Sequence, residues 1–126
     1  MRKDDVIERL QKATGPDREL DAAIAELFGW SDIRGWPGLS TGEHPEGGRR
    51  LVPRYTMHFE SAMSLVPETH TWHEIKGPHA YLNIPTPKPN YWSCYLDTFN
   101  HEGGVKAWGA TPALAICIAA LNARHD

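Results

Sequence analysis

Residues 111–121 read Thr111-Pro112-Ala113-Leu114-Ala115-Ile116-Cys117-Ile118-Ala119-Ala120-Leu121, and this stretch decides the fold. Thr111 suits the N-cap of a helix and Pro112 its first position, so the sequence predicts a helix over residues 111–124. The run that follows is apolar almost all the way round, and a helix of that kind is buried on more than one side. We expect it to lie between a sheet and the amino-terminal helices, or between a sheet and another subunit.

Strands are predicted directly before this helix, because apolar and polar residues alternate between turn residues. The predicted strands cover residues 71–75, 79–84, 91–96 and 105–108. Gly77-Pro78 marks the first turn. In the third strand, Trp92, Cys94 and Leu96 share one face. The sequence therefore predicts a three- to four-stranded antiparallel sheet.

Two helices are predicted at the amino terminus, over residues 4–13 and about 17–28. An apolar stripe at helical spacing supports the second, and Gly29 suits its C-cap. A third, short helix at about 57–65 would begin after Thr56 as its N-cap.

Between the second and third predicted helices, the apolar residues of the segment 29–53 show neither helical nor strand spacing. The segment is rich in glycine and proline and includes Trp30 and Trp36. So long a stretch inside a compact domain is typical of a functional or partly disordered segment. We expect a long irregular loop whose tryptophans are pinned to the core or to a ligand.

Length and composition indicate one domain spanning residues 1–126. The order of elements predicts an α+β fold: a layered α/β sandwich with N-terminal helices, an antiparallel sheet and a buried C-terminal helix. The formal net charge of −3 gives no long-range attraction to nucleic acid or to an anionic membrane.

The amino terminus leads into an amphipathic helix rather than an apolar signal segment, and no apolar run is long enough to span a bilayer. Cys94 and Cys117 are expected on the apolar faces of a strand and of the last helix, as buried free thiols. A disulfide between them is the alternative. These features favour a reducing, cytoplasmic compartment.

Three segments resemble one protein family. They are Gly15-Pro16-Asp17-Arg18-Glu19-Leu20-Asp21, Pro53-Arg54-Tyr55-Thr56 with Ser61-Ala62, and Thr111 to Cys117 continuing to Ala123-Arg124. Taken in order, they are similar to the phage ABA sandwich domain family, small accessory proteins of tailed phages and prophages. The resemblance implies an α/β/α layered domain, a phage origin and therefore the cytoplasm of a bacterial host. It carries no settled activity, so no catalytic residue is transferred.

Arginine and aromatic residues near residues 29–56 are the candidate ligand-binding site. Guanidinium groups beside a helix N-terminus at Thr56 can hold a phosphate, and Arg34 and His44 are placed to join them. The candidate set is Trp30, Arg34, Trp36, Arg49, Arg50, Arg54, Tyr55 and Thr56. The alternative is a solvated basic loop.

Tyrosines form a second candidate surface. Regular alternation puts Tyr81, Tyr91 and Tyr95 on the sheet face opposite the apolar residues. Such a face can stack a nucleobase or bury a partner. The alternative is that helices cover both faces, as the family's layer order implies, which would make these rings part of the core.

The sequence carries no metal or catalytic motif. His70 and His73 would point to opposite faces of a strand, and no Cys-x-x-Cys or helical His-x-x-x-His occurs. There is no nucleophile elbow, Walker loop or zincin motif. His101 and Glu102 near Asp97 offer acid–base chemistry, with an ordinary polar turn as the simpler interpretation. We therefore expect no cofactor, no metal and no enzymatic activity.

The absence of a catalytic motif predicts a binding protein. The resemblance to the phage family then implies a phage-encoded accessory protein, which we expect to counter host anti-phage defence by sequestering a nucleotide signal or by blocking a host protein. One alternative is an RNA-binding module with the topology of double-stranded-RNA-binding domains, although the start of the last helix has no lysine or arginine to reach phosphates. A phage structural or assembly role is another. The apolar last helix and the spare tryptophans also predict a symmetric homodimer.

Overall fold

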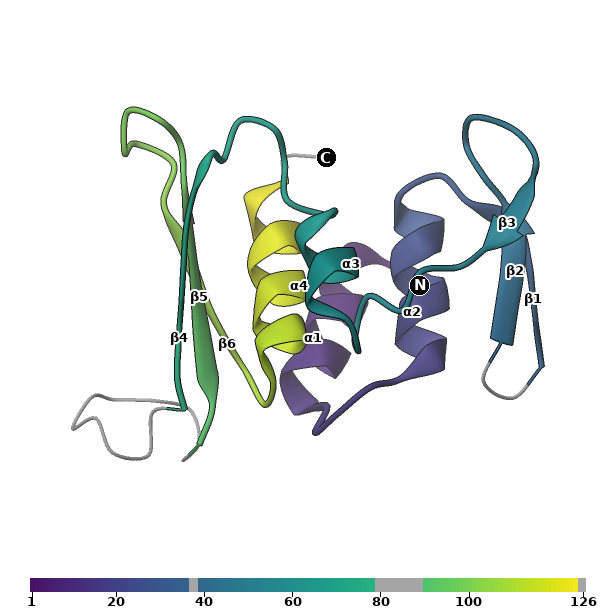
Figure 1. The fold of residues 1–126 in the computed structure, drawn as a ribbon, viewed down its shortest axis with the longest axis horizontal. Helices are drawn as coiled ribbons and strands as arrows, with labels where there is room; N and C mark the ends of the chain where they lie inside the picture. Colours follow the sequence, from purple (N-terminus) through teal and green to yellow (C-terminus); the bar gives the residue numbers. More distant parts are fainter. Residues whose placement is uncertain (37–38, 79–89, 125–126) are drawn as a thin grey trace.

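The computed structural model describes residues 1–36, 39–78 and 90–124. These ranges contain four helices and two three-stranded antiparallel sheets, so the fold is mixed α+β, as the sequence predicted. The helices lie between the two sheets, with the carboxyl-terminal sheet at one end of the molecule and the amino-terminal sheet at the other (Figure 1).

The carboxyl-terminal sheet consists of β4 (Trp72–Lys76), β5 (Trp92–Asp97) and β6 (Val105–Gly109), in that order across the sheet. The predicted strands at 71–75, 91–96 and 105–108 are therefore confirmed to within a residue or two. The strand predicted at 79–84 lies outside the described residues. Trp92, Cys94 and Leu96 face the helices as expected, because all three belong to or pack against the core.

Helix α4 (Pro112–Ala123) is the centre of the core. Thr111 Oγ1 accepts a hydrogen bond from Leu114 N at 3.2 Å and Pro112 is the first helical residue, so the predicted start is confirmed. Every side chain from Ala113 to Leu121 is buried. The helix packs on β5 and β6 on one side and on α1 and α3 on the other. Of the two expected positions, the structure therefore has the one within the chain.

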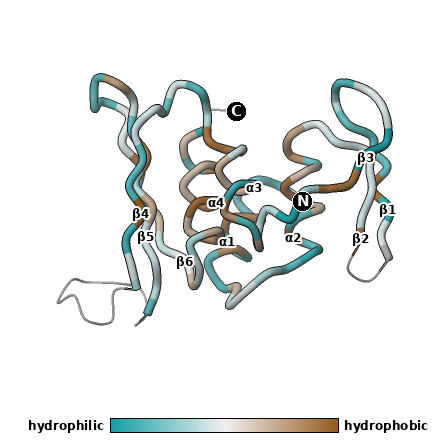
Figure 2. Tube along the Cα trace, viewed as in Figure 1, coloured by the Kyte–Doolittle hydropathy of each residue, from teal (hydrophilic) through white to brown (hydrophobic). Residues whose placement is uncertain are grey.

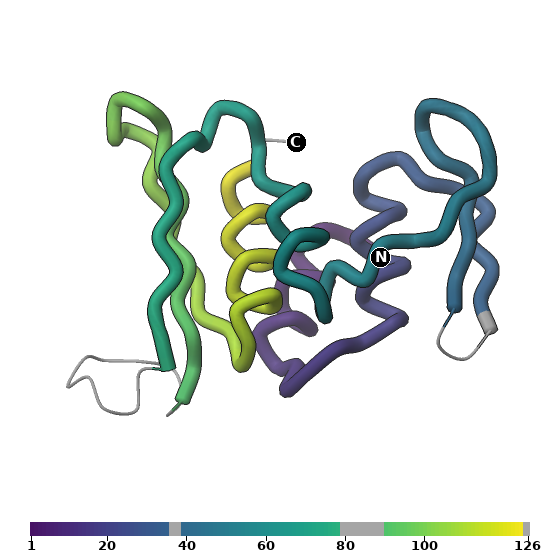
Figure 3. Tube along the Cα trace, viewed as in Figure 1, coloured from purple at the N-terminus to yellow at the C-terminus, as the bar shows by residue number. Residues whose placement is uncertain are grey.

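Helices α1 (Lys3–Lys12) and α2 (Arg18–Leu27) confirm the two predicted amino-terminal helices. Asp17 caps α2 by accepting a hydrogen bond from Leu20 N. Gly29 follows α2 with φ +93°, the left-handed conformation expected of a glycine that ends a helix. The first and last helices of the chain lie side by side (Figure 3). The hydropathy colouring shows apolar residues concentrated in these central helices (Figure 2).

The expectation of a long irregular loop over residues 29–53 is wrong. Three strands form there: β1 (Ser31–Trp36), β2 (Leu39–Glu43) and β3 (Arg49–Leu51). Gly47 and Gly48 have φ near +100° and +90°, which allows the tight turn between β2 and β3. The strands are short and β3 is exposed throughout, so the sequence shows no alternating apolar pattern that would predict them.

The predicted helix over 57–65 is shorter than expected, because α3 covers only Phe59–Met63. Thr56 does not cap it. The Thr56 hydroxyl is buried instead and bonds to Asp21 Oδ1 at 2.8 Å. His58 takes the N-cap position without a side-chain hydrogen bond.

Both cysteines are free and buried, Cys94 in β5 and Cys117 in α4. Burial raises the pKa of Cys94 to about 12. Cys117 Sγ donates a hydrogen bond to the Tyr55 carbonyl at 3.2 Å. None of the helices in the described ranges is both long and apolar enough to cross a membrane.

Candidate functional site

The aromatic members of the candidate set do not form a ligand cavity with the arginines. Trp30 is only 8% exposed and belongs to the core, where its ring contacts the edge of the His44 ring at 4.9 Å between centroids. Tyr55 and Thr56 are buried as well, and burial raises the pKa of Tyr55 to about 12. The side chain of Trp36 lies outside the described part of the structure. Trp30, Tyr55 and Thr56 thus act as packing groups.

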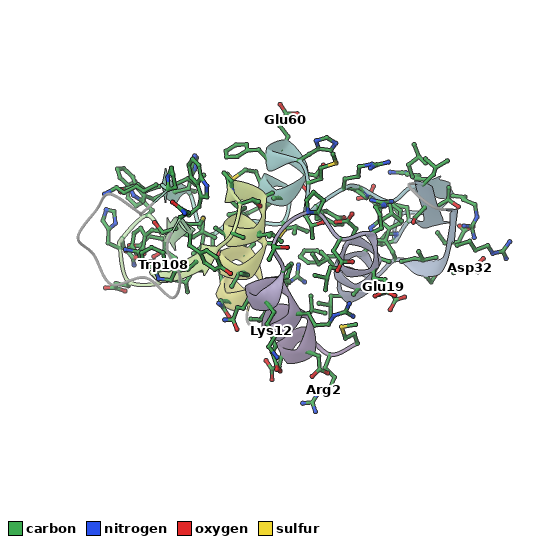
Figure 4. All side chains as sticks on the ribbon, turned by 90° about the horizontal axis from the view of Figure 1, so that it is seen from below. Arg2, Lys12, Glu19, Asp32, Glu60 and Trp108 are labelled. Carbon is green, nitrogen blue, oxygen red and sulfur yellow. The ribbon has the colours of Figure 1, made fainter. Side chains whose placement is uncertain are left out.

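The arginines of the set mainly stabilise the amino-terminal sheet. Arg34 and Arg49 both contact the Asp32 carboxylate, at 3.0 Å and 2.5 Å, and Arg49 also donates to Thr41 Oγ1. Arg50 donates to the Gly47 carbonyl at 3.4 Å. Asp32 lies at the opposite end of the molecule from Trp108 (Figure 4).

Arg54 does not join this group. It lies in the segment before α3 and contacts Met57 Sδ at 3.8 Å. The structure therefore does not gather the predicted arginines around one phosphate site.

The outer face of the carboxyl-terminal sheet is the surface that the structure leaves open. Among the described elements no helix packs on this side, so the expected covering of both faces by helices is wrong for this sheet (Figure 1). We call it the open face. Its members are Trp72, Glu74 and Lys76 of β4, Ser93, Tyr95 and Asp97 of β5, and Lys106 and Trp108 of β6.

The predicted tyrosine face is partly confirmed. Tyr95 lies on the open face, and the absence of a side chain at Gly104 gives it room, because a Cβ there would stand 2.6 Å from the Tyr95 hydroxyl. Tyr91 is buried beside α1 instead, with its hydroxyl 3.5 Å from the Gln11 carbonyl. Tyr81 lies outside the described residues.

Strand register places charged and hydroxyl groups side by side on the open face. Tyr95 is paired with Glu74 on one side and with Lys106 on the other, and Ser93 is paired with Lys76 and Trp108. These rows enclose a cavity of about 230 Å³, which we call the polar cavity. It is lined by Glu74, Lys76, Ser93, Tyr95 and Lys106.

Two cations and one anion line the polar cavity. Lys76 Nζ contacts Glu74 Oε1 at 2.6 Å, and Lys106 Nζ lies 5.0 Å from the centre of the Trp108 ring. Lys76 is thus paired with Glu74, and the Tyr95 hydroxyl donates its hydrogen bond to Asp97. Lys106 is therefore the group of the described lining best placed to meet an anion. An ammonium group in this position can bind a small anion.

A second cavity adjoins the polar one at the outer edge of β6. Its volume is about 340 Å³, and we call it the edge cavity. Its lining comes from α1, α4, β6 and the residue before β5: Gln11, Tyr91, Lys106, Ala107, Trp108, Ile118 and Asn122. Lys106 lines both cavities.

Asp97 organises the turn between β5 and β6. Its buried carboxylate accepts hydrogen bonds from the Tyr95 hydroxyl at 2.5 Å, from Thr98 N at 2.8 Å and from Gly103 N at 3.2 Å. The Tyr95 hydroxyl, followed by these backbone donors, holds the pKa of Asp97 below its usual value. The same bond raises the pKa of Tyr95. This carboxylate is thus ionised and fully engaged in the turn.

The acid–base group considered in the sequence is only partly assembled. His101 Nδ1 lies 3.3 Å from Asp97 Oδ2, and its ring meets the edge of Trp72 with centroids 5.9 Å apart. Glu102 turns away and accepts from Asn100 at 3.1 Å. Within the described ranges, no three His, Cys, Asp or Glu residues come close enough together to hold a metal ion.

Sequence reasoning missed most of the two cavities. The alternation of Lys106 and Trp108 with the apolar Val105 and Ala107 was the available signal for β6, and the register across β5 then brings Lys106 beside Tyr95. Gln11 and Asn122 carry no such signal, because they meet β6 only in the folded chain.

Comparisons of the chain with family models, with curated proteins and with solved structures gave no significant match.

Proposed function

We propose that the protein is a binding protein for a small anionic ligand of nucleotide type, held on the open face. The observation that carries the proposal is the lysine-lined polar cavity on the open face, with Tyr95 in its wall and the Trp108 ring beside Lys106. Aromatic rings stack on nucleobases, and ammonium groups bind phosphate oxygens. Trp72 is 51% exposed, which is unusual for a tryptophan with only a packing role.

The charge distribution favours a small ligand over a nucleic acid strand. A protein that tracks a polynucleotide neutralises many phosphates with lysine and arginine. The polar cavity offers two lysines and one glutamate, and α4 begins Thr111-Pro112-Ala113 without a cation. Because Lys76 is paired with Glu74, this charge suits a single phosphate group, and for this reason we do not favour the RNA-binding alternative.

The resemblance to phage accessory proteins suggests a biological setting for such binding. A protein that holds a nucleotide signal without converting it would lower the free concentration of that signal in the host. Blocking of a host protein is the competing form of the same proposal. It predicts that a host protein, rather than a nucleotide, copurifies with the chain.

Calorimetry with nucleoside monophosphates, cyclic oligonucleotides and ADP-ribose tests the proposal. Lys106→Glu should weaken binding at least tenfold, because a charge-assisted hydrogen bond contributes about 1.5–3 kcal/mol. Arg2→Glu makes the same charge change at an exposed residue far from the open face, and it should leave binding unchanged (Figure 4). Absence of heat with every ligand, together with no nucleotide released on denaturation, would contradict the proposal.

A further inference from the structure

We propose that the edge cavity receives the base of this ligand while the polar cavity receives its phosphate, so that the bound nucleotide crosses β6 at Lys106. The inference rests on the proposed function and adds to it the orientation of the ligand and the residues that select it. It starts from the geometry of β6, which is the only strand of the described residues that lines both cavities.

The walls of the edge cavity suit a flat heterocycle. Ala107, Ile118 and Tyr91 form its buried floor, and the partly exposed Trp108 supplies aromatic surface at its wall. The volume of about 340 Å³ lies within the range of small-molecule sites, which are mostly apolar with a few placed polar groups. The polar cavity is smaller, at about 230 Å³, and more charged, which suits a phosphate group.

The rim of the edge cavity can distinguish one base from another. Gln11 at the end of α1 and Asn122 near the end of α4 are both exposed residues at this cavity. A side-chain amide offers a donor and an acceptor together, and this pair matches the hydrogen-bonding edge of a nucleobase. β6 is also an edge strand of its sheet, so part of its backbone N–H and C=O groups points away from β5.

Lys106 fixes the distance between the two ends of the ligand. Its ammonium group lies over the Trp108 ring at 5.0 Å, and the residue borders both cavities. A ligand with a planar ring in one cavity and an anion in the other would therefore pass this ammonium group.

The test compares the affinities of AMP, GMP, CMP and UMP, measured by tryptophan fluorescence. We expect the wild-type protein to prefer one base at least tenfold, and we expect the double variant Gln11→Leu, Asn122→Leu to lose that preference while still binding. Lys12→Leu is the matched control, since Lys12 is the exposed neighbour of Gln11 and does not line the cavity. It should keep the wild-type preference. Thermal melting of each variant verifies that it is folded.

Failure of this inference is distinguishable from failure of the proposed function. If the double variant keeps the wild-type base preference while Lys106→Glu weakens all four ligands, the base does not lie in the edge cavity and the proposed function stands. If the wild-type protein binds all four nucleotides equally well, the base likewise does not lie in the edge cavity, and the proposed function stands. If the wild-type protein binds none of them, nor any larger nucleotide, both proposals fall.

Discussion

Asp21 is the side chain on which α2 and the segment before α3 depend most. Its carboxylate is 1% exposed and accepts hydrogen bonds from Thr56 N, from Thr56 Oγ1 and from Arg18 Nη1, each at 2.8 Å. We expect Asp21→Ala to lower the free energy of unfolding by about 3–5 kcal/mol, because it leaves buried donors and a cation without a partner. Urea unfolding measures this.

The neighbouring acidic residue provides the control for that prediction. Glu19 is exposed on the same helix and forms only a surface ion pair with Arg9, so Glu19→Ala should change the free energy of unfolding by less than about 1 kcal/mol. A loss below about 1 kcal/mol in Asp21→Ala would show that the network contributes little.

Asp97 gives the protein a pH dependence of predictable sign. The Tyr95 hydroxyl lowers the pKa of Asp97 in the folded state. The ionised carboxylate therefore stabilises the fold at pH values above the pKa of an aspartate in the unfolded chain, which is about 3.9. This stabilisation is lost as the pH falls through the folded-state pKa. We expect Asp97→Asn to reduce the loss of stability between about pH 5 and pH 2, measured by urea unfolding. The exposed-site variant Glu68→Gln should retain the wild-type profile, and a wild-type profile in Asp97→Asn would contradict the assignment.

The junction between β6 and α4 leaves no room for a side chain at Gly109. A Cβ added at Gly109 would stand 2.5 Å from Ala115 N and 2.9 Å from the Leu114 carbonyl carbon, both backbone atoms of α4. We expect Gly109→Ala to destabilise the protein by about 2 kcal/mol or more, because helix and strand must separate to admit the methyl group. Gly15→Ala is the control, since a Cβ there meets nothing within 4 Å. Equal melting temperatures for the two variants would refute this packing.

Elements with strong periodicity were predictable from the sequence, and elements made by tertiary contacts were not. The apolar run of α4 predicts a buried helix, and the alternation of apolar and polar residues in β5 predicts a strand. The strands β1–β3 were missed because Gly47 and Gly48 look like loop residues and β3 has no buried side chain. Thr56 was assigned to a helix cap because its buried partner, Asp21, is distant in sequence.

At the scale of the whole molecule, the carboxyl-terminal sheet is packed firmly against the helices and the amino-terminal sheet is packed more loosely. Helix α4 packs on β5, β6, α1 and α3, whereas β1–β3 of the described structure pack mainly on one another. Trp30, Ile33 and Val52 join the amino-terminal sheet to the core. We expect amides of β1–β3 to exchange with deuterium well before those of β5 and α4, as elements with few buried contacts do. Uniform protection across both sheets, measured by hydrogen exchange, would contradict this.

The homodimer prediction rested on the apolar surface of α4 and on the spare tryptophans. The side chains of α4 from Ala113 to Leu121 are buried within the chain, whereas Trp72 remains 51% exposed. A sedimentation experiment that finds only species of 14.1 kDa would contradict the dimer.

In the candidate site, too, features set by neighbouring residues were predictable, whereas features set by contacts between distant segments were not. Tyr95 was placed correctly by alternation along one strand. The two cavities required the register of three strands and the approach of α1 and α4 to the edge of β6. The arginine cluster of the amino-terminal sheet was a reasonable prediction of a phosphate site, yet Asp32 and the hairpin backbone occupy most of its members.

The most direct test of nucleotide binding at the open face is an NMR titration that follows the indole N–H signals. Addition of the nucleoside monophosphate that binds best should shift the signal of Trp108, which lines the edge cavity beside Lys106, and leave the buried Trp30 unchanged. A titration that moves the Trp30 signal while Trp108 stays still would place the ligand elsewhere and contradict the account.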